Sequence, residues 1–193
     1  LVDPDNRRPV DFGERAHMLN RVSKHIQIGA IASNQVISKQ ADFLKSCLNE
    51  IEDGSCKLLI AAATMACRKQ FNNIYTKGRY IPLEVNGSAE RHIIAFAREF
   101  EGNWSITVVP RLVSTLLKAD GSAKLNELNV FDILSSGTGE HVWGDTTISL
   151  PSELTDRNLV DCLSMQILNN SDNVLKVSDV FNSFPVAIIT TTT

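Results

Sequence analysis

The spacing of apolar residues in the first third of the chain predicts helices. These residues recur at intervals of three and four positions, on one face of a helix: Phe12, Ala16, Leu19, Val22 and Ile26. Asp11 precedes them and Glu14 follows it by three positions, a pattern typical of a capping box. We expect a first helix that begins after Asp11 and ends near Gly29.

Two more helices are predicted before residue 77. Asn34 is the expected cap of the second, which ends at the Asp53-Gly54-Ser55 break. Its apolar stripe is Ile37, Ala41, Leu44, Cys47 or Leu48, and Ile51. The third, KLLIAAATMACRKQF at residues 57–71, is apolar almost all round, so we expect it to lie between other elements and not on a surface.

After Gly78 the apolar period changes to two, which is typical of strands. Residues 80–85 form the first candidate, and Pro82 places it at a sheet edge or a bulge. Asn86 followed by Gly87 predicts a tight hairpin turn, because both central residues of such a turn need positive φ. Residues 92–98 would be the return strand.

The rest of the chain reads as short strands separated by turns. A turn at residues 101–103 leads into a strand in which Trp104, Ile106 and Val108 share a face, and a short helix follows at 112–117. Residues 119–140 are an irregular excursion, and the later strand candidates are 146–150, 162–168, 174–177 and 185–190. The predicted class is α+β, with a helical part at 1–77 and a C-terminal antiparallel β-sandwich at 78–193.

Composition narrows the function classes. The net charge is -3 and no basic stripe is visible, which argues against nucleic-acid binding. The longest apolar run, residues 58–63, is far short of the ~20 residues of a membrane span. The N-terminus lacks the pattern of a signal peptide. We expect a soluble cytoplasmic protein that binds no membrane, no nucleic acid and no cofactor.

Cysteine and histidine spacing predicts no metal site. The cysteines lack CxxC spacing and are expected to pack mainly as small apolar groups: Cys47, Cys56, Cys67 and Cys162. The histidines show no ligand spacing and are expected on the surface or with satisfied hydrogen bonds: His17, His25, His92 and His141. Trp104 and Trp143 could stack on sugar rings. Trp104 alternates with Ile106 and Val108, which favours a place in the core. For Trp143, both a structural role and sugar stacking stay open.

Charged residues crowd the N-terminal segment DPDNRRP, residues 3–9. One interpretation is a turn with solvated arginines, because Asp-Pro and Asp-Asn pairs initiate turns. The other is a polar network of Asp3, Asp5, Arg7 and Arg8 that grips a sugar or braces an acidic neighbour. Arginine suits the second role, since its fixed fork of donors matches carboxylates and sugar hydroxyls.

Five blocks of sequence carry a family resemblance. LVDPDNRRPVDF, residues 1–12, resembles the loop after the last barrel strand in the α-amylase superfamily. The other blocks follow in order: GRYIPLEVNGSAERHIIAFAR (78–98), ITVVPRLVSTLL (106–117), WGDTTISLP (143–151) and VSDVFNSFPVAII (177–189). Together they resemble the C-terminal end of the maltooligosyl trehalose synthase family.

The resemblance implies an intramolecular transglucosylase. Such enzymes convert the reducing-end α-1,4 linkage of a maltooligosaccharide into an α,α-1,1 linkage. Retaining chemistry uses two carboxyl groups roughly 5 Å apart. In this family those groups belong to earlier barrel strands, so no catalytic residue is assigned here. The resemblance makes Asp3, Asp5, Arg7 and Arg8 substrate-binding candidates on the rim of the barrel, without choosing between the two arginines.

We therefore expect a C-terminal fragment of a longer enzyme, inactive alone, whose helical part closes the catalytic barrel. The start without methionine, inside a loop, motivates this expectation. The fragment would meet maltooligosaccharide only through the full-length enzyme. Helix faces taken from the barrel would leave apolar patches, so self-association is predicted. The alternatives are a stand-alone glycan-binding module and a purely structural interaction domain.

Overall fold

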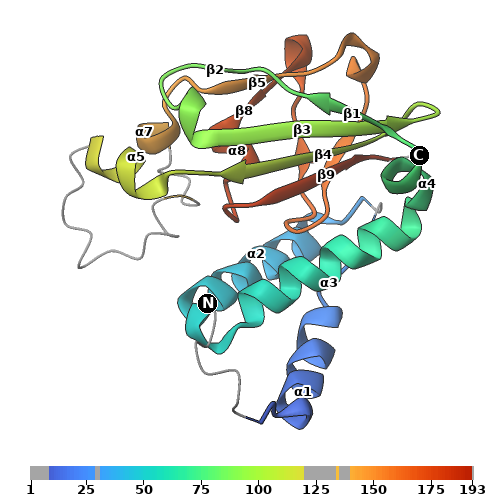
Figure 1. The fold of residues 1–193 in the computed structure, drawn as a ribbon, viewed down its shortest axis with the longest axis vertical. Coiled ribbons are helices and arrows are strands. Elements are labelled where there is room, and N and C mark those ends of the chain that lie inside the picture. The colour runs from blue at the N-terminus through green and yellow to red at the C-terminus, as the bar shows by residue number, and fades with distance from the viewer. Residues whose placement is uncertain (1–8, 29–30, 120–133, 135–139, 193) are drawn as a thin grey trace.

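The long helices α1, α2 and α3 occupy a different part of the protein from the strands (Figure 1). The computed structural model describes residues 9–28, 31–119, 134 and 140–192. Figure 1 shows α1, α2 and α3 gathered on one side of the strands. The α-helices are α1 (Phe12–Ser23), α2 (Asn34–Asn49), α3 (Ser55–Gln70), α4 (Asn72–Thr76), α5 (Val113–Ala119), α7 (Glu140–Trp143) and α8 (Val177–Val180). Short 3-10 turns lie at Ile51–Asp53, Glu90–His92, Ser152–Leu154 and Ser171–Asn173.

Helix α1 begins as predicted but ends early. The Asp11 carboxylate accepts a hydrogen bond from the Glu14 backbone N–H at 2.9 Å, which confirms the predicted cap. The helix ends at Ser23, well before Gly29. Only part of its apolar stripe is covered, since Val22 is fully buried whereas Phe12 is 76% exposed.

Helices α2 and α3 pack through one face each. α2 begins at Asn34 with Ser33, not Asn34, as its N-cap residue, and it buries Leu44 and Cys47 among others. The prediction that α3 is enclosed on all sides is wrong. It buries the stripe Cys56, Leu59, Ala63 and Cys67. On another side Met65 is 69% exposed, because the elements that contact α3 cover only the buried stripe.

The strands form two antiparallel sheets. They are β1 (Arg79–Pro82), β2 (Val85–Asn86), β3 (Ile93–Phe100), β4 (Asn103–Pro110), β5 (Thr147–Ser149), β6 (Leu159–Asp161), β7 (Ile167–Leu168), β8 (Val174–Lys176) and β9 (Ala187–Thr191). One sheet has the order β1-β3-β4-β9-β6-β7 and the other β2-β5-β8. The predicted α+β class is confirmed, whereas the sandwich arrangement stays a prediction.

One predicted turn is confirmed and another is wrong. Glu101 and Gly102 both have positive φ and join β3 to β4 in a two-residue turn. The hairpin expected at Asn86 and Gly87 does not form, because Asn86 belongs to β2 and pairs with Thr147 of β5. β1 still pairs with β3 and lies at the edge of its sheet, as Pro82 predicted.

The later strands follow the predictions except around β6 and β7. β4, β5, β8 and β9 occupy predicted strand positions, and α5 occupies the predicted short helix. The strand predicted at 162–168 is confirmed only for residues 167–168, which form β7, because residues 162–166 form a turn between β6 and β7. Strand β6 at Leu159–Asp161 was not predicted. Most of the irregular excursion predicted at 119–140 lies outside the described residues.

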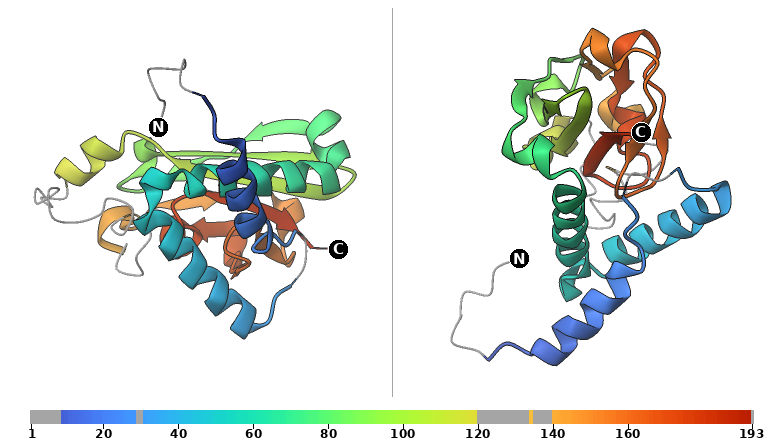
Figure 2. Two further views of the ribbon diagram at one scale, coloured as in Figure 1. Left: turned by 90° about the horizontal axis from the view of Figure 1, so that it is seen from below. Right: turned by 90° about the vertical axis from the view of Figure 1, so that its right-hand side faces the viewer.

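Two apolar clusters make up the core. The strand cluster belongs wholly to residues after 82 and includes Trp104, Ile106 and Phe181. The helical cluster joins residues of α1, α2 and α3 to four residues of the strand region: Cys162, Leu163, Phe184 and Ile188. The right-hand view of Figure 2 shows α1, α2 and α3 below the strand region. The domain boundary at residue 77 stays a prediction, although α4 ends at Thr76 and β1 begins at Arg79.

Candidate functional site

The predicted sugar-binding residues lie outside the part of the chain that the structure describes. Asp3, Asp5, Arg7 and Arg8 all belong to residues 1–8. Their role in substrate binding therefore stays a prediction. The candidate binding site within the described residues is a pocket in the strand region.

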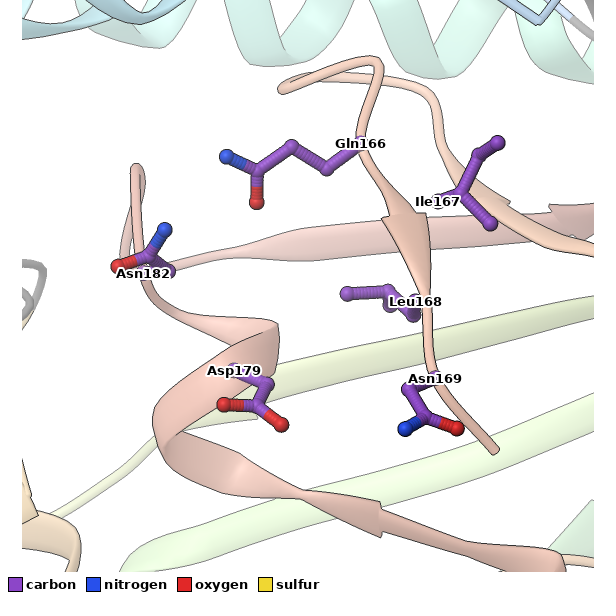
Figure 3. A pocket seen from close by; sticks show the side chains of 6 residues that line it. All are labelled: Gln166, Ile167, Leu168, Asn169, Asp179 and Asn182. Atoms are coloured by element: carbon purple, nitrogen blue, oxygen red, sulfur yellow. The ribbon is translucent and has the colours of Figure 1, made fainter. Parts of the chain in front are cut away.

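An open, mostly polar pocket lies beside β7 and α8. Its volume is about 340 Å³. It is lined by Gln166, Ile167, Leu168, Asn169, Asp179 and Asn182. Figure 3 shows that these residues come from two segments, one running along β7 and the other through α8 to the residues just after it. Four of the six carry amide or carboxyl groups, so the pocket offers both donors and acceptors.

A buried carboxylate shapes the turn that enters this pocket. Asp161 is 1% exposed, and its Oδ2 accepts hydrogen bonds from the Ser164 backbone N–H at 2.8 Å and the Ser164 hydroxyl at 2.6 Å. Its Oδ1 accepts one from the Ile188 N–H of β9 at 3.0 Å. Burial raises the pKa of the Asp161 carboxyl, and these hydrogen bonds oppose that rise. The turn, which ends at Gln166, is thereby tied to the six-stranded sheet.

Further hydrogen bonds brace the pocket. The Gln166 side-chain amide donates to the Ser183 hydroxyl at 2.9 Å, which joins the two lining segments. Just beyond β7, the Asn170 side-chain amide donates to the Leu154 carbonyl at 2.8 Å and to the Arg157 carbonyl at 3.2 Å. These contacts hold both segments in place without a ligand.

The pocket has the chemistry of a binding site and lacks that of a glycosyl-transfer site. Its amide and carboxyl groups can hydrogen-bond hydroxyl groups of a small polar molecule. Retaining glycosyl transfer uses two carboxyl groups, and Asp179 is the one acidic residue among the six that line the pocket. The sequence pattern did not predict this pocket. Asp179 and Asn182 nevertheless lie in the VSDVFNSFPVAII block that carries part of the family resemblance.

Both tryptophans are core residues. Trp104 is 2% exposed, as its alternation with Ile106 predicted. Trp143 is fully buried, its ring lies 5.2 Å from that of Phe181, and its Nε1 donates to the Leu134 carbonyl at 3.1 Å. Stacking of Trp143 on a sugar ring is therefore excluded in this fold, because no face of the indole is open to solvent.

Two of the four histidines, His17 and His25, follow the prediction. His17 is exposed, and the His25 ring stacks on Phe43 while its Nδ1 lies 3.2 Å from the Gln40 side-chain oxygen. His92 departs from the prediction. It is buried, and its Nδ1 has no hydrogen-bond partner among the described residues. The side chain of His141 lies outside the described part.

A buried amide that sequence reasoning missed joins the helices to the strands. Gln40 of α2 is 2% exposed, and its Nε2 donates to the His25 carbonyl at 3.0 Å and to the Leu163 carbonyl at 2.6 Å. Its position on the apolar side of α2 was the available signal, since a buried amide needs specific partners.

The cysteines are buried, free thiols within the helical cluster, as predicted: Cys47, Cys56, Cys67 and Cys162. In the part that the structure describes, no three His, Cys, Asp or Glu residues gather in a way that could hold a metal ion. No helix of that part is long and apolar enough to cross a bilayer.

Comparison with known proteins gives one structural likeness. No protein-family model and no curated protein matches the sequence. Among solved structures, the chain is similar to a mutant of maltooligosyltrehalose synthase from Arthrobacter ramosus, with a TM-score of 0.60 and 24% sequence identity. The match covers 100% of this chain and 18% of that chain. At this identity the likeness shows a shared fold.

Proposed function

We propose that this chain is the C-terminal part of an intramolecular transglucosylase that forms a trehalose unit at the reducing end of a maltooligosaccharide. The observation that carries the proposal is the fold likeness to maltooligosyltrehalose synthase over the whole chain. The order of the five resembling sequence blocks supports it independently of the coordinates. The two carboxyl groups that such chemistry requires would belong to the rest of the polypeptide.

In this proposal the helices of residues 1–77 close the catalytic barrel, and residues 78–193 form a β-sandwich with a structural role. The incomplete cover of the helices supports the first part. Phe12 is 76% exposed and Met65 is 69% exposed, and further protein packed on these helices would remove this apolar area from water.

The same exposure gives the isolated chain a reason to self-associate. We expect light scattering to show an apparent mass above that of the monomer, which rises with concentration. A Phe12→Ser, Met65→Ser variant should move toward the monomer. The matched control is Tyr80→Ser, Ile167→Ser, which changes exposed apolar residues of the strand region. A wild-type chain that is monomeric at high concentration would contradict this expectation.

The substrate contacts proposed for this chain are Asp3, Asp5, Arg7 and Arg8 on the barrel rim. An arginine fork there would hydrogen-bond a sugar or hold a site carboxylate. Lysine keeps the charge and loses the fork. Arg7→Lys and Arg8→Lys, each made in the full-length enzyme, would identify the arginine that matters by its loss of kcat/KM.

The activity test uses the complete natural polypeptide that carries this sequence. Incubated with maltopentaose, it should yield a product without a reducing end, whereas the 193-residue chain alone should leave the substrate unchanged. A complete polypeptide without this activity, or turnover by the 193-residue chain itself, would overturn the proposal. A stand-alone glycan-binding module receives less support, since the burial of Trp143 removes its proposed aromatic contact.

A further inference from the structure

Two thiols meet where the helices contact the strands. Cys67 lies on α3, and Cys162 directly follows β6, 95 positions later in the chain. Both are free and almost fully buried, at 0% and 2% exposure. Their Sγ atoms are 3.9 Å apart. Nothing in the proposed glycosyl transfer uses this pair.

We propose that Cys67 and Cys162 are an oxidative modification site, at which a peroxide converts the two thiols into a disulfide that links α3 to the β6–β7 turn. This inference is independent of the proposed function. It rests on the placement of the two sulfurs and on the polar groups around them.

The geometry is close to that of a disulfide. The sulfurs are in van der Waals contact, and a bond of about 2.0 Å requires them to approach by about 2 Å. The Cys162 backbone N–H donates to the Ile188 carbonyl of β9 at 2.7 Å, so the backbone of the turn is held. Rotation of the two side chains therefore has to supply most of this movement.

Polar neighbours distinguish the two thiols. The Tyr75 hydroxyl lies 3.1 Å from the Cys67 sulfur, and the Ser105 hydroxyl lies 2.8 Å from the Tyr75 oxygen. A Cys67 thiolate can accept from both Tyr75 and the Cys162 thiol. These hydrogen bonds lower the pKa of Cys67, whereas the contact with Cys67 and burial raise the pKa of Cys162. Cys67 is therefore the sulfur that reacts first.

The reaction balances in two steps. The Cys67 thiolate attacks one peroxide oxygen and becomes a sulfenic acid, and the departing hydroxide takes a proton and leaves as water. The Cys162 sulfur then attacks the Cys67 sulfur, the S–O bond breaks as the S–S bond forms, and the released hydroxide takes the Cys162 proton. Two thiols are oxidised to one disulfide, and hydrogen peroxide is reduced to two water molecules.

Access for the peroxide comes through the hairpin that Cys162 enters. β7 is two residues long and lies at the end of the sheet order, so it is an edge strand. Ile167 in this strand is 49% exposed. Short edge elements open locally at lower free energy than the whole fold. We expect peroxide to reach the thiols when this hairpin opens, which breaks the hydrogen bonds of Asp161 and Cys162 to Ile188 of β9.

The test maps disulfides in the protein after treatment with excess hydrogen peroxide, with circular dichroism as the check that it stays folded. A tryptic digest without reductant should yield residues 58–68 joined to residues 158–176, lighter than the two peptides by two hydrogen atoms. A reductant should separate them. Closing so long a loop should also raise Tm by about 5–15 °C.

Matched variants separate this pair from the other two thiols. The Cys47→Ser, Cys56→Ser variant should keep the cross-link and the Tm shift, and Cys67→Ser, Cys162→Ser should lose both. If the second variant does not fold, the digest of the wild-type protein decides alone. A folded wild-type protein whose Cys67 and Cys162 remain thiols, oxidise singly to sulfinic acids or pair with other cysteines would overturn the proposal.

Discussion

The strand cluster and the helical cluster differ in where their buried residues come from. The strand cluster takes all its residues from one region, and Trp104 and Ile106 are buried within it. The helical cluster depends on Phe184 and Ile188 from the strand region and still leaves Met65 exposed on α3. An apolar stripe therefore shows that a helix has a face to bury, and not that this chain buries it.

The largest expected effect comes from emptying the strand cluster. Trp104→Ala removes the largest side chain of β4 and should lower the free energy of unfolding by about 3–5 kcal/mol. Urea denaturation followed by circular dichroism measures this loss. Because the helical cluster depends on strand residues, helical and tertiary signals should fall together, and retention of a stable helical part would contradict this dependence.

A substitution in the helical cluster should destabilise a smaller part of the protein than Trp104→Ala. Leu59→Ala empties a buried position of α3 and should cost about 2–4 kcal/mol. Hydrogen exchange should show lost protection in α2 and α3 while β4 stays protected, because the strand cluster takes no residue from α1, α2 or α3. Equal loss of protection in β4 would show that the two clusters are one cooperative unit.

An element could be predicted from the sequence where the elements that it contacts are close to it along the chain. β3 and β4 are joined by a two-residue turn, so local pattern and turn chemistry specify both. α3 has apolar residues on several sides, and its cover depends on elements distant in sequence, which periodicity does not reveal. The 162–168 strand failed for a related reason. The Asp161 carboxylate binds backbone N–H groups of its own turn and of β9, a contact that sequence spacing does not show.

The candidate functional residues show the same difference between local sequence pattern and tertiary packing. The sequence singled out Asp3, Asp5, Arg7 and Arg8 from their local density of charge. The pocket beside β7 and α8 combines Gln166 with Asp179 and Asn182, whose meeting depends on tertiary packing. No local pattern predicts such a meeting.

A smaller effect is expected at the start of α1. Asp11→Ala removes the acceptor of the Glu14 N–H and should cost about 1 kcal/mol, seen as faster hydrogen exchange in the first turn. Asp11→Asn keeps an acceptor and should stay close to wild type. Because α1 contributes no residue to the strand cluster, β4 should not respond. An Asn variant as unstable as the Ala variant would argue against capping as the cause.

The smallest effect depends on pH and belongs to the β3–β4 hairpin. The Gly102 N–H donates to Glu99 at 2.8 Å, and this bond together with Arg79 lowers the pKa of the Glu99 carboxyl. Its contribution is therefore present above the ordinary carboxyl pKa and lost as pH falls through the lowered value.

Glu99→Gln should thus be less stable than wild type at pH 7, by less than about 1 kcal/mol, and equal to it in strong acid. Urea denaturation across this pH range measures the difference. Glu84→Gln, which removes an exposed acid of the same region, should show no such pH-dependent gap. A Glu99→Gln gap that persists in strong acid would rule out ionisation as its source.

The central proposal is that other parts of a longer enzyme pack against the exposed faces of the helices in residues 1–77. Hydroxyl-radical footprinting, followed by peptide mass spectrometry, tests it most directly through the oxidation of Met65. Tyr80, which is exposed in the strand region, is the control residue in the same experiment. The account predicts fast oxidation of Met65 in the 193-residue chain and strong protection in the complete natural polypeptide. Equal oxidation rates in the two would contradict it.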